Sequence, residues 1–308
     1  MIPLNQHRAA FGRHETFPLR FGWLTKGFAA WCDNSEIFDQ DDSTVVLGVG
    51  KNMVNAIKYW MTAAQIVAAH GASVSETELG RAMFAKDGWD RYVEDDSTLW
   101  LLHWLIASNA ADATATYWFF NHFHKPEFAA PEVAKALEEF CREKISTRFS
   151  ASTLKHDVAL ILRMYQRSEV ARGVPLEDTL DSPLSLLGLV QAPSTGRVHQ
   201  SRPSPRPRLP IAAFGYAVLD LLAAMGQSAL PVEKISRATA GYAAPGAVFR
   251  LTDDGTITKL EELVRWMPET FELRETAGIH QIYLLRQMKP LELLGHHYSQ
   301  YGSLKEAA

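Results

Sequence analysis

The strongest constraint on the fold is a nearly apolar stretch from Ile211 to Met225, in which Asp220 is the one charged residue. A helix needs about 20 apolar residues to cross a bilayer, so this stretch is too short to span one. We therefore expect a helix that contributes to a protein core, and no membrane partner. The segment from Thr98 to Ser108 is similarly dense in Leu and Trp, which predicts a second buried helix.

Composition narrows the class of protein further. The chain has 308 residues, 47% of them hydrophobic, and a formal net charge of -4, which excludes a disordered chain. This length indicates about two domains, or three small ones. The N-terminus, MIPLNQHR, lacks the apolar core of a signal peptide, and Cys32 and Cys141 are too few for a disulfide framework or a thiolate zinc site. We expect a soluble protein of the reducing cytoplasm.

Helical spacing of apolar residues runs through the first half of the chain. It predicts a helix over Met53–Ala69 that stops at Gly71, followed by helices over Ser75–Phe84, Thr98–Ser108, Thr116–Phe123 and Pro131–Cys141. Ser152 is the predicted N-cap of a basic helix that ends near Tyr165. A basic helix that follows another helix through Ser-Ala-Ser-Thr is typical of a helix-turn-helix, although any helical hairpin fits the same pattern.

The C-terminal part predicts helices followed by a β-hairpin. Helices are expected over Ile211–Met225, Val232–Ala238, Pro245–Leu251 and Ile257–Trp266, with a turn at Asp253–Gly255. The segments Phe271–Glu275 and Ile279–Leu285 flank Thr-Ala-Gly, which is typical of a hairpin. We predict a mainly α fold: helical bundle-like domains with winged-helix units, in which a helix-turn-helix is followed by a β-hairpin.

Charge is distributed unevenly along the chain. Met1–Ala30 holds four cations against one acid, and Arg142–Arg172 holds seven against three. Arg197–Arg208 adds four arginines and no acid. A near-neutral total therefore does not exclude an anionic partner, although each patch alone could be an ordinary solvated face.

The segment from Phe11 to Gly27 interleaves cations with aromatic residues. Cations bind phosphates and aromatic faces stack on bases, so the segment predicts contact with nucleic acid. The aromatic residues could instead anchor the segment to the core. Across the basic patches, the predicted DNA-contacting residues are Arg13, Arg20, Trp23, Lys26, Lys51, Asn52, Arg148, Lys155, Arg202 and Arg206.

A glycine turn, Leu-Gly-Val-Gly-Lys-Asn over residues 47–52, resembles a phosphate-binding loop. A Walker motif needs Gly where Val45 stands and Ser or Thr where Asn52 stands, so we expect no nucleotide cofactor. The turn still delivers Lys51 and Asn52 to a helix N-terminus, where backbone amides and the helix dipole favour an anion such as a DNA phosphate. The alternative is a glycine-containing helix start without a ligand.

Candidate catalytic residues are few. Glu94 and Asp95 precede the Trp-rich helix, where carboxylates could hold Mg²⁺ or Mn²⁺, or could cap the helix instead. His14 and Glu15 are the other candidates, with His14 as a general acid or base. His103 is expected in the core, and His296–His297 is expected as a surface pair.

The charge and helix patterns divide the chain into four parts. Residues 1–128 form a helical, winged-helix-like region that contacts DNA, and residues 129–191 form a helix-turn-helix-like basic unit. Residues 192–210, rich in Pro, Ser and Arg, are a linker or loop. Residues 211–308 form a C-terminal winged-helix-like domain.

An ordered set of short motifs resembles one family across nearly the whole chain. The motifs occupy residues 13–17, 20–27, 47–53, 92–95, 98–104, 120–121, 182–184 and 245–251. Together they are similar to the domain-of-unknown-function family numbered four thousand and seven, which includes a nickase-type component of the Ssp DNA phosphorothioation systems. The resemblance implies a role in replacing a backbone oxygen of DNA by sulfur, beside an SspC-like ATPase and an SspD-like sulfur-transfer protein.

The leading hypothesis is a protein that binds duplex DNA and nicks it with a divalent metal to permit sulfur incorporation. In this hypothesis the N-terminal cations hold phosphates, while Glu94 and Asp95 hold the metal. The rival hypothesis is a non-catalytic DNA-binding adaptor or regulator that recruits the modification enzymes.

Overall fold

The computed structural model describes residues 1–71, 73–166, 182–192, 198–276 and 278–306. Its α-helices are α1 (Trp23–Asp33), α2 (Ser43–Leu47), α3 (Lys51–Ala63), α4 (Glu78–Phe84), α5 (Asp96–Ala107), α6 (Thr114–Asn121), α7 (Ala130–Lys144), α8 (Ala151–Tyr165), α10 (Ile211–Met225), α11 (Val232–Ser236), α12 (Pro245–Val248), α13 (Asp253–Trp266) and α14 (Pro290–Glu306), with short 3-10 helices η1 (Ile37–Asp39) and η2 (Pro183–Leu187). The strands are β1 (Val67–His70), β2 (Ser73–Glu76), β3 (Glu127–Phe128), β4 (His199–Gln200), β5 (Ala229–Pro231), β6 (Phe271–Thr276) and β7 (Ile279–Leu284). The prediction of a mainly α fold is confirmed, with small antiparallel sheets added.

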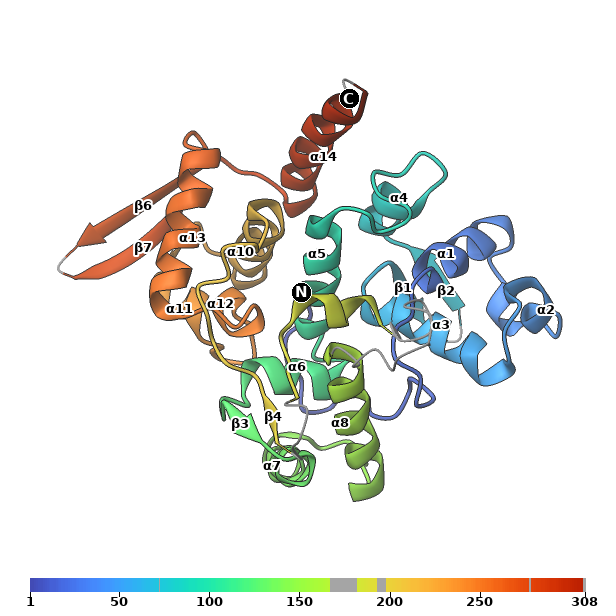
Figure 1. The fold of residues 1–308 in the computed structure, drawn as a ribbon. Helices are drawn as coiled ribbons and strands as arrows, with labels where there is room; N and C mark the ends of the chain where they lie inside the picture. The colour runs from blue at the N-terminus through green and yellow to red at the C-terminus, as the bar shows by residue number, and fades with distance from the viewer. Residues whose placement is uncertain (72, 167–181, 193–197, 277, 307–308) are drawn as a thin grey trace, which may run out of the picture.

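The two apolar stretches form the centre of the molecule, where α5 packs beside α10 (Figure 1). All residues of α5 except Asp96 are buried, as the sequence predicts. Asp220, the one charge of α10, accepts a hydrogen bond from the Trp104 indole at 2.9 Å and one from the Met1 ammonium at 2.6 Å. These partners explain how a carboxylate is tolerated in an otherwise apolar helix. None of the described helices is both long and apolar enough to cross a membrane.

The predicted helix over Met53–Ala69 is wrong in its second half. Helix α3 ends at Ala63 because Gln65 has a φ of 57°, in the left-handed region that a helix cannot continue through. The chain then forms β1, which pairs with β2 across residues that were expected to be loop and helix. Thr77 caps the shortened helix α4 by accepting the Gly80 N–H at 2.9 Å.

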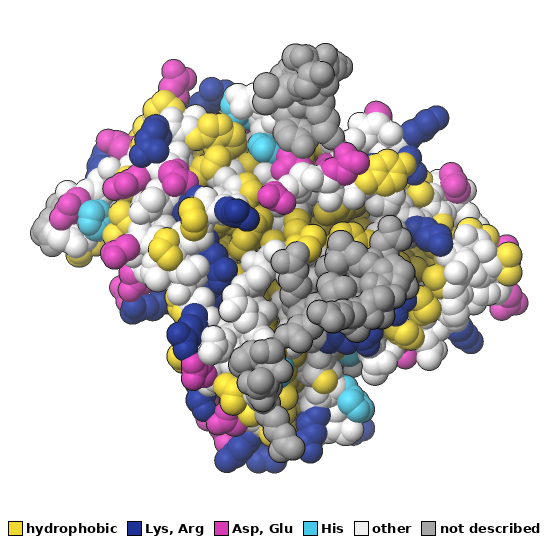
Figure 2. All heavy atoms as spheres, in the orientation of Figure 1, with side chains coloured by type: hydrophobic (Ala, Val, Ile, Leu, Met, Phe, Trp, Pro, Cys, Tyr) yellow, Lys and Arg dark blue, Asp and Glu magenta, His cyan; other side chains and the backbone are white. Residues whose placement is uncertain are grey.

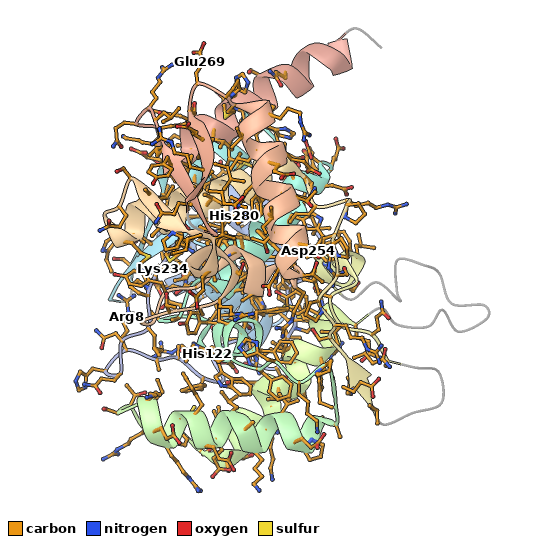
Figure 3. The ribbon with its side chains drawn as sticks, turned by 90° about the vertical axis from the view of Figure 1, so that its left-hand side faces the viewer. Arg8, His122, Lys234, Asp254, Glu269 and His280 are labelled. Atoms are coloured by element: carbon orange, nitrogen blue, oxygen red, sulfur yellow. The ribbon has the colours of Figure 1, made fainter. Side chains whose placement is uncertain are left out.

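Helices α7 and α8 pack against each other at the end of the molecule opposite α14 (Figures 1 and 3). The predicted cap of α8 is corrected by two residues. The Ser150 hydroxyl accepts the Thr153 N–H at 3.1 Å, and Ser152 lies inside the first turn. The basic run Arg142–Arg172 is described as far as residue 166, so its last cations lie outside the described residues.

The predicted linker or loop, residues 192–210, includes residues 193–197, which lie outside the described residues. Residues 198–210 run from β4, beside β3, to the start of α10. They are held at several places. Strand β4 pairs with β3, the Ser204 N–H donates to the Arg250 carbonyl at 2.9 Å, and Leu209 is 2% exposed. We call residues 198–210 the strap.

The C-terminal part has the order α10, β5, α11, α12, α13, β6, β7, and its sheet has the strand order β5-β7-β6. The predicted hairpin of β6 and β7 is confirmed. The predicted turn at Asp253–Gly255 is instead the first turn of α13, because Thr252 accepts the Gly255 N–H at 3.1 Å and starts the helix earlier. Figure 3 looks onto α13, with Asp254 at its N-terminal end.

Candidate nucleic-acid interface

The glycine turn brings two predicted lysines to one helix start. Gly48 ends α2 in the left-handed conformation, with a φ of 57°, and Gly50 is the N-cap of α3 without a side-chain cap. The Lys26 Nζ of α1 lies 3.6 Å from the point where a Gly48 Cβ would stand. Lys51 and Asn52 are exposed in the first turn of α3. This helix start therefore presents its positive dipole end together with two ammonium groups.

The basic surface continues along α3. This helix contains no acidic residue, and Asn55 and Lys58 follow Lys51 at helical spacing. Asn55, Lys58 and the predicted Arg13 line one pocket of about 220 Å³, together with the carboxylate of Asp112. The Lys58 ammonium lies 3.0 Å from Asp39 Oδ1, so part of its charge is neutralised. Sequence reasoning missed Asn55 and Lys58, although the absence of acids from the whole helix was a usable signal.

Arg20 and Trp23 lie together, but in different surroundings. The Arg20 guanidinium stacks 5.8 Å from the Phe17 ring centre and 5.5 Å from that of Trp23. The Arg20 Nε is buried, and none of the residues that the structure describes gives it a hydrogen-bond partner. Trp23 is 5% exposed, so its ring packs against Arg20 and is not accessible to a base. The neighbouring Phe21 is 47% exposed. The exposed aromatic surface of the segment therefore belongs to Phe21.

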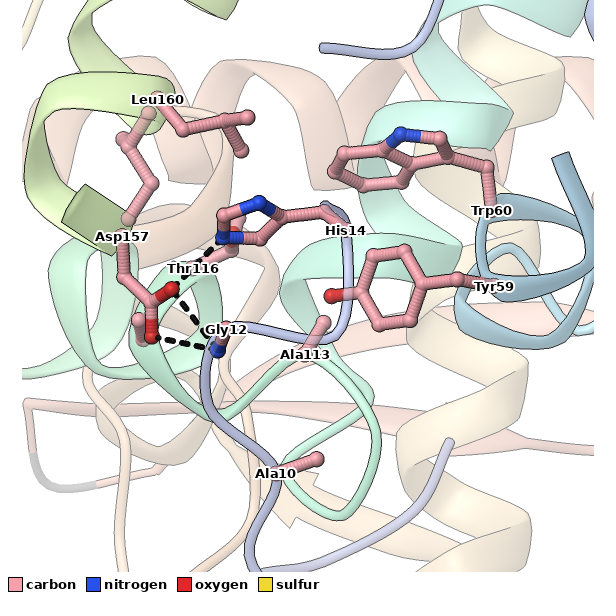
Figure 4. A pocket seen from close by; sticks show the side chains of 11 residues that line it. Ala10, Gly12, His14, Tyr59, Trp60, Ala113, Thr116, Asp157 and Leu160 are labelled. Carbon is pink, nitrogen blue, oxygen red and sulfur yellow. Dashed lines mark hydrogen bonds and ion pairs between the residues drawn. The ribbon is translucent and has the colours of Figure 1, made fainter. Parts of the chain in front are cut away.

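His14 is buried, and both of its ring nitrogens have partners, of which Figure 4 shows Asp157. Nε2 lies 2.6 Å from Asp157 Oδ1, and Nδ1 accepts the Thr16 N–H at 3.0 Å. Because Nδ1 is an acceptor, the neutral ring carries its proton on Nε2 and donates it to Asp157. The Gly12 N–H donates to the same carboxylate at 2.9 Å. This pair ties the N-terminal segment to α8.

The space beside His14 is small. The pocket that it shares with Tyr59, Trp60 and Asp157 has a volume of about 10 Å³, which admits one water molecule at most. Glu15 is exposed and has a φ of 50°. The catalytic roles of His14 and Glu15 stay predictions.

Asp95 is the N-cap of α5. Its Oδ1 accepts the Ser97 N–H at 2.7 Å, and its Oδ2 lies 2.9 Å from His297 Nε2 of α14. Burial opposes ionisation of Asp95, but the hydrogen bonds from His297 and from the Ser97 amide outweigh it, so the pKa of this carboxyl is lowered. His297 therefore does not form the predicted surface pair with His296. His103 lies in the core, as predicted.

The predicted metal ligands do not form a ligand set. Among the described residues, no group of three or more His, Cys, Asp or Glu side chains is arranged to hold a metal ion. Both oxygens of Asp95 already have partners, and Glu94 is exposed beside it. Glu94 and Asp95 therefore do not fit Mg²⁺ or Mn²⁺ in this arrangement.

The other predicted DNA-contacting residues lie elsewhere. Arg148 and Lys155 are exposed around the start of α8, and Arg202 on the strap is ion-paired with Glu127. Arg206 is half-buried on the strap. The structure thus brings Lys26, Lys51 and Asn52 together at one helix start. The two candidate catalytic side chains His14 and Asp95 are not brought together. His14 contacts Asp157 of α8, and Asp95 contacts His297 of α14.

Comparison with known proteins agrees with the sequence motifs. The model of the family described as "Protein of unknown function (DUF4007)" matches residues 11–298. The chain belongs to the DUF4007 family. This membership confirms the resemblance inferred from the motifs, and the match begins within the aromatic and basic N-terminal segment.

The solved structures similar to this DUF4007 chain include two of SspB. One is a magnesium ion-bound SspB crystal structure, with a TM-score of 0.84, 27% identity, and coverage of 96% of this chain and 89% of that one. The other is an SspB crystal structure with a TM-score of 0.82, 27% identity, and coverage of 96% and 90%. A comparison with curated proteins gave no match.

Proposed function

We propose that this chain acts as an SspB-type component of DNA phosphorothioation and binds duplex DNA through α3. The observation that carries the proposal is the acid-free helix α3, whose uncapped start lies beside Lys26 and carries Lys51. Phosphate oxygens are the ligands that such a start favours, and Asn55 and Lys58 extend the same face. The structural similarity to SspB supports the assignment to the Ssp system.

We also propose that the C-terminal part is a winged-helix unit. The order of α10, β5, α11, α13, β6 and β7, with β5 paired to the last strand, supports this assignment. The helix that would read DNA in such a unit is α13, but it carries Asp253, Asp254, Glu261 and Glu262. This charge favours α3 over α13 as the phosphate-binding helix.

The proposal is tested by the salt dependence of duplex binding. If about six or more phosphates are contacted, affinity falls by about 10³-fold between 50 and 200 mM salt. Lys51→Ala and Lys26→Ala each lower the slope of log affinity against log salt by about 1, with the melting temperature unchanged, because both side chains are exposed. Lys289→Ala, exposed before α14, is the matched control and leaves the slope unchanged.

A flat salt dependence contradicts multi-phosphate binding. If Lys51→Ala lowers the melting temperature and leaves the DNA affinity unchanged, Lys51 stabilises the fold and does not bind phosphate. That result rejects the interface on α3.

The second candidate function is nicking of duplex DNA, and the non-catalytic adaptor is its alternative. The observation that favours nicking is the magnesium ion in one similar SspB structure. Relaxation of supercoiled plasmid by the purified protein with Mg²⁺ or Mn²⁺, abolished by EDTA, supports nicking. Duplex binding without relaxation under these conditions supports the adaptor.

A further inference from the structure

A cavity of about 430 Å³ lies between the start of α5, η2 and the strap. Its lining includes Asp96, Trp100, Leu187, Arg206, Arg208 and Leu209. In Figure 2, hydrophobic side chains gather in the middle of the face drawn, below a cluster of acidic side chains. A concave site with an apolar wall and a few polar groups is typical of a small-ligand site, and this volume lies within the usual range.

Arg206 is the unusual member of this lining. Within the part of the chain that the structure describes, its buried Nε has no hydrogen-bond partner, and its Nη atoms reach only the Gly188 carbonyl at 3.5 Å and the Arg202 carbonyl at 3.4 Å. No carboxylate of the described residues lies within ion-pairing distance of Arg206. Its φ of 48° is also in the left-handed region, which a residue with a side chain adopts at a cost. A half-buried guanidinium held this weakly is available to an anion.

A second guanidinium, that of Arg250, lies near enough to Arg206 to be affected by its charge. Arg250 is 4% exposed, and its partners among the described residues are the Ser201 hydroxyl and the Phe119, Phe120 and Phe123 carbonyls at the end of α6, with no carboxylate. Burial, and then the charge of Arg206, lower the pKa of Arg250 to about 9. The charge of Arg206 therefore adds to the cost of keeping Arg250 ionised, and an anion beside Arg206 would reduce that cost.

The rest of the lining indicates what the anion is attached to. Trp100, Leu187 and Leu209 form an apolar wall that suits a flat ring. Asp96 supplies a carboxylate that can accept an N–H from a base edge, as acidic side chains accept from cytosine. Guanidinium, apolar wall and carboxylate together match the three parts of a nucleotide: phosphate, base face and base edge.

We propose that this cavity takes one nucleotide of the bound DNA, turned out of the duplex, with its phosphate at Arg206 and Arg208 and its base against Trp100. This inference rests on the proposed DNA-binding function and specifies its substrate class as an unstacked nucleotide. Enzymes that act on a nucleotide within a duplex commonly turn it out of the stack into such a pocket.

The test measures binding of deoxycytidine monophosphate to the full chain by calorimetry, with deoxycytidine and inorganic phosphate as separate probes. The monophosphate is expected to bind at least tenfold more tightly than either part. Arg206→Gln lowers that affinity at least tenfold, and Arg286→Gln, exposed after β7, is the matched control without effect. Leu186→Trp provides a second variant, because residue 186 is 44% exposed at the cavity rim and a larger ring there blocks entry without changing charge.

The outcomes separate this inference from the proposed function. Loss of monophosphate binding in Arg206→Gln and Leu186→Trp, with retention in Lys51→Ala and Arg286→Gln, supports it. Equal affinity for phosphate alone, or no monophosphate binding by the parent chain, overturns it, while salt-dependent duplex binding through Lys51 then still stands. Monophosphate binding without any duplex binding overturns the DNA-binding function and leaves the cavity as a site for free nucleotides.

Discussion

Asp95 illustrates how a residue chosen for catalysis can be explained by structure. Its carboxylate caps α5 through Ser97 and bonds His297 of α14, so it connects two helices whose residues are 202 positions apart. The neighbouring Asp90 adds to this junction, because its Oδ1 and Oδ2 accept the N–H groups of Glu94 and Asp95 at 2.9 Å. If Asp95 is a helix cap, its replacement lowers the stability of the fold and leaves nicking intact. If it is a metal ligand, its replacement abolishes nicking.

Asp95→Asn and Glu94→Gln distinguish the two roles. Asp95→Asn keeps an oxygen for the Ser97 N–H but removes the charge beside His297, so we expect a loss of roughly 1–2 kcal/mol in the free energy of unfolding. Glu94 is exposed, so Glu94→Gln changes the free energy of unfolding by less than about 0.5 kcal/mol. Urea unfolding measures both values. If plasmid nicking is observed and persists in both variants, neither residue is a metal ligand.

At the scale of elements, the position of a helix cap decides how the following helix is built. The Ser150 hydroxyl accepts the Thr153 N–H, and Ser152 lies exposed in the first turn of α8. The sequence Ser-Ala-Ser-Thr offers both serines to the same role, so local propensity alone does not choose between them.

Ser150→Ala and Ser152→Ala form a matched pair for this helix. Ser150→Ala removes the cap and is expected to cost about 1 kcal/mol in the free energy of unfolding. Ser152→Ala places a better helix former in an exposed turn, so stability is unchanged or slightly increased. Thermal or urea unfolding of both variants measures the difference, and the reverse ranking would place the cap at Ser152.

At the scale of the whole molecule, buried histidines make the fold sensitive to acid. Burial lowers the pKa of His103 to about 3 and that of His122 to about 4. The Tyr165 hydroxyl lies 2.8 Å from His103 Nδ1, and the Val248 carbonyl lies 2.9 Å from Nε2. A carbonyl can only accept, so the neutral ring carries its proton on Nε2 and joins α5, α8 and α12 as a neutral group.

The sign of the pH effect follows from these pKa values. Below pH 6.5 the unfolded chain binds protons at His103 and His122 that the folded chain does not, so stability falls as the pH drops from 6.5 towards 4. Each histidine contributes about 1.4 kcal/mol per pH unit at most. Urea unfolding at pH 7, 6 and 5 measures the slope. His103→Gln is less stable at pH 7 but has a shallower slope, and an unchanged slope would contradict a neutral buried His103.

The lowered pKa of Asp95 acts in a separate window. A carboxyl whose folded pKa is depressed stabilises the fold above its unfolded value, near 3.8, and loses that contribution as the pH falls further. The loss of stability between pH 6.5 and about 5 therefore reports on the histidines and not on Asp95.

The sequence by itself determined the features that depend on neighbouring residues. Thr98–Ser108 and Ile211–Met225 are apolar on every side of a helix, which predicts that both helices are buried. The residues on both sides of Thr-Ala-Gly favour β-strands, which predicts the hairpin. The glycine turn placed Lys51 and Asn52 at a helix start because a local left-handed residue and an N-cap suffice for that. The end of α3 was missed because Gln65 in a left-handed conformation has no local signature.

The tertiary structure alone decided which distant residues meet. Lys26 over Gly48, His297 on Asp95, Arg250 at the end of α6, and the cavity beside Arg206 each join segments far apart in the chain. Periodicity and propensity describe one helix or strand at a time, whereas these contacts follow from how the elements pack in three dimensions. The sequence therefore supplied the chemistry of the candidate site, and packing determined which of those groups share a surface and which are buried in structural pairs.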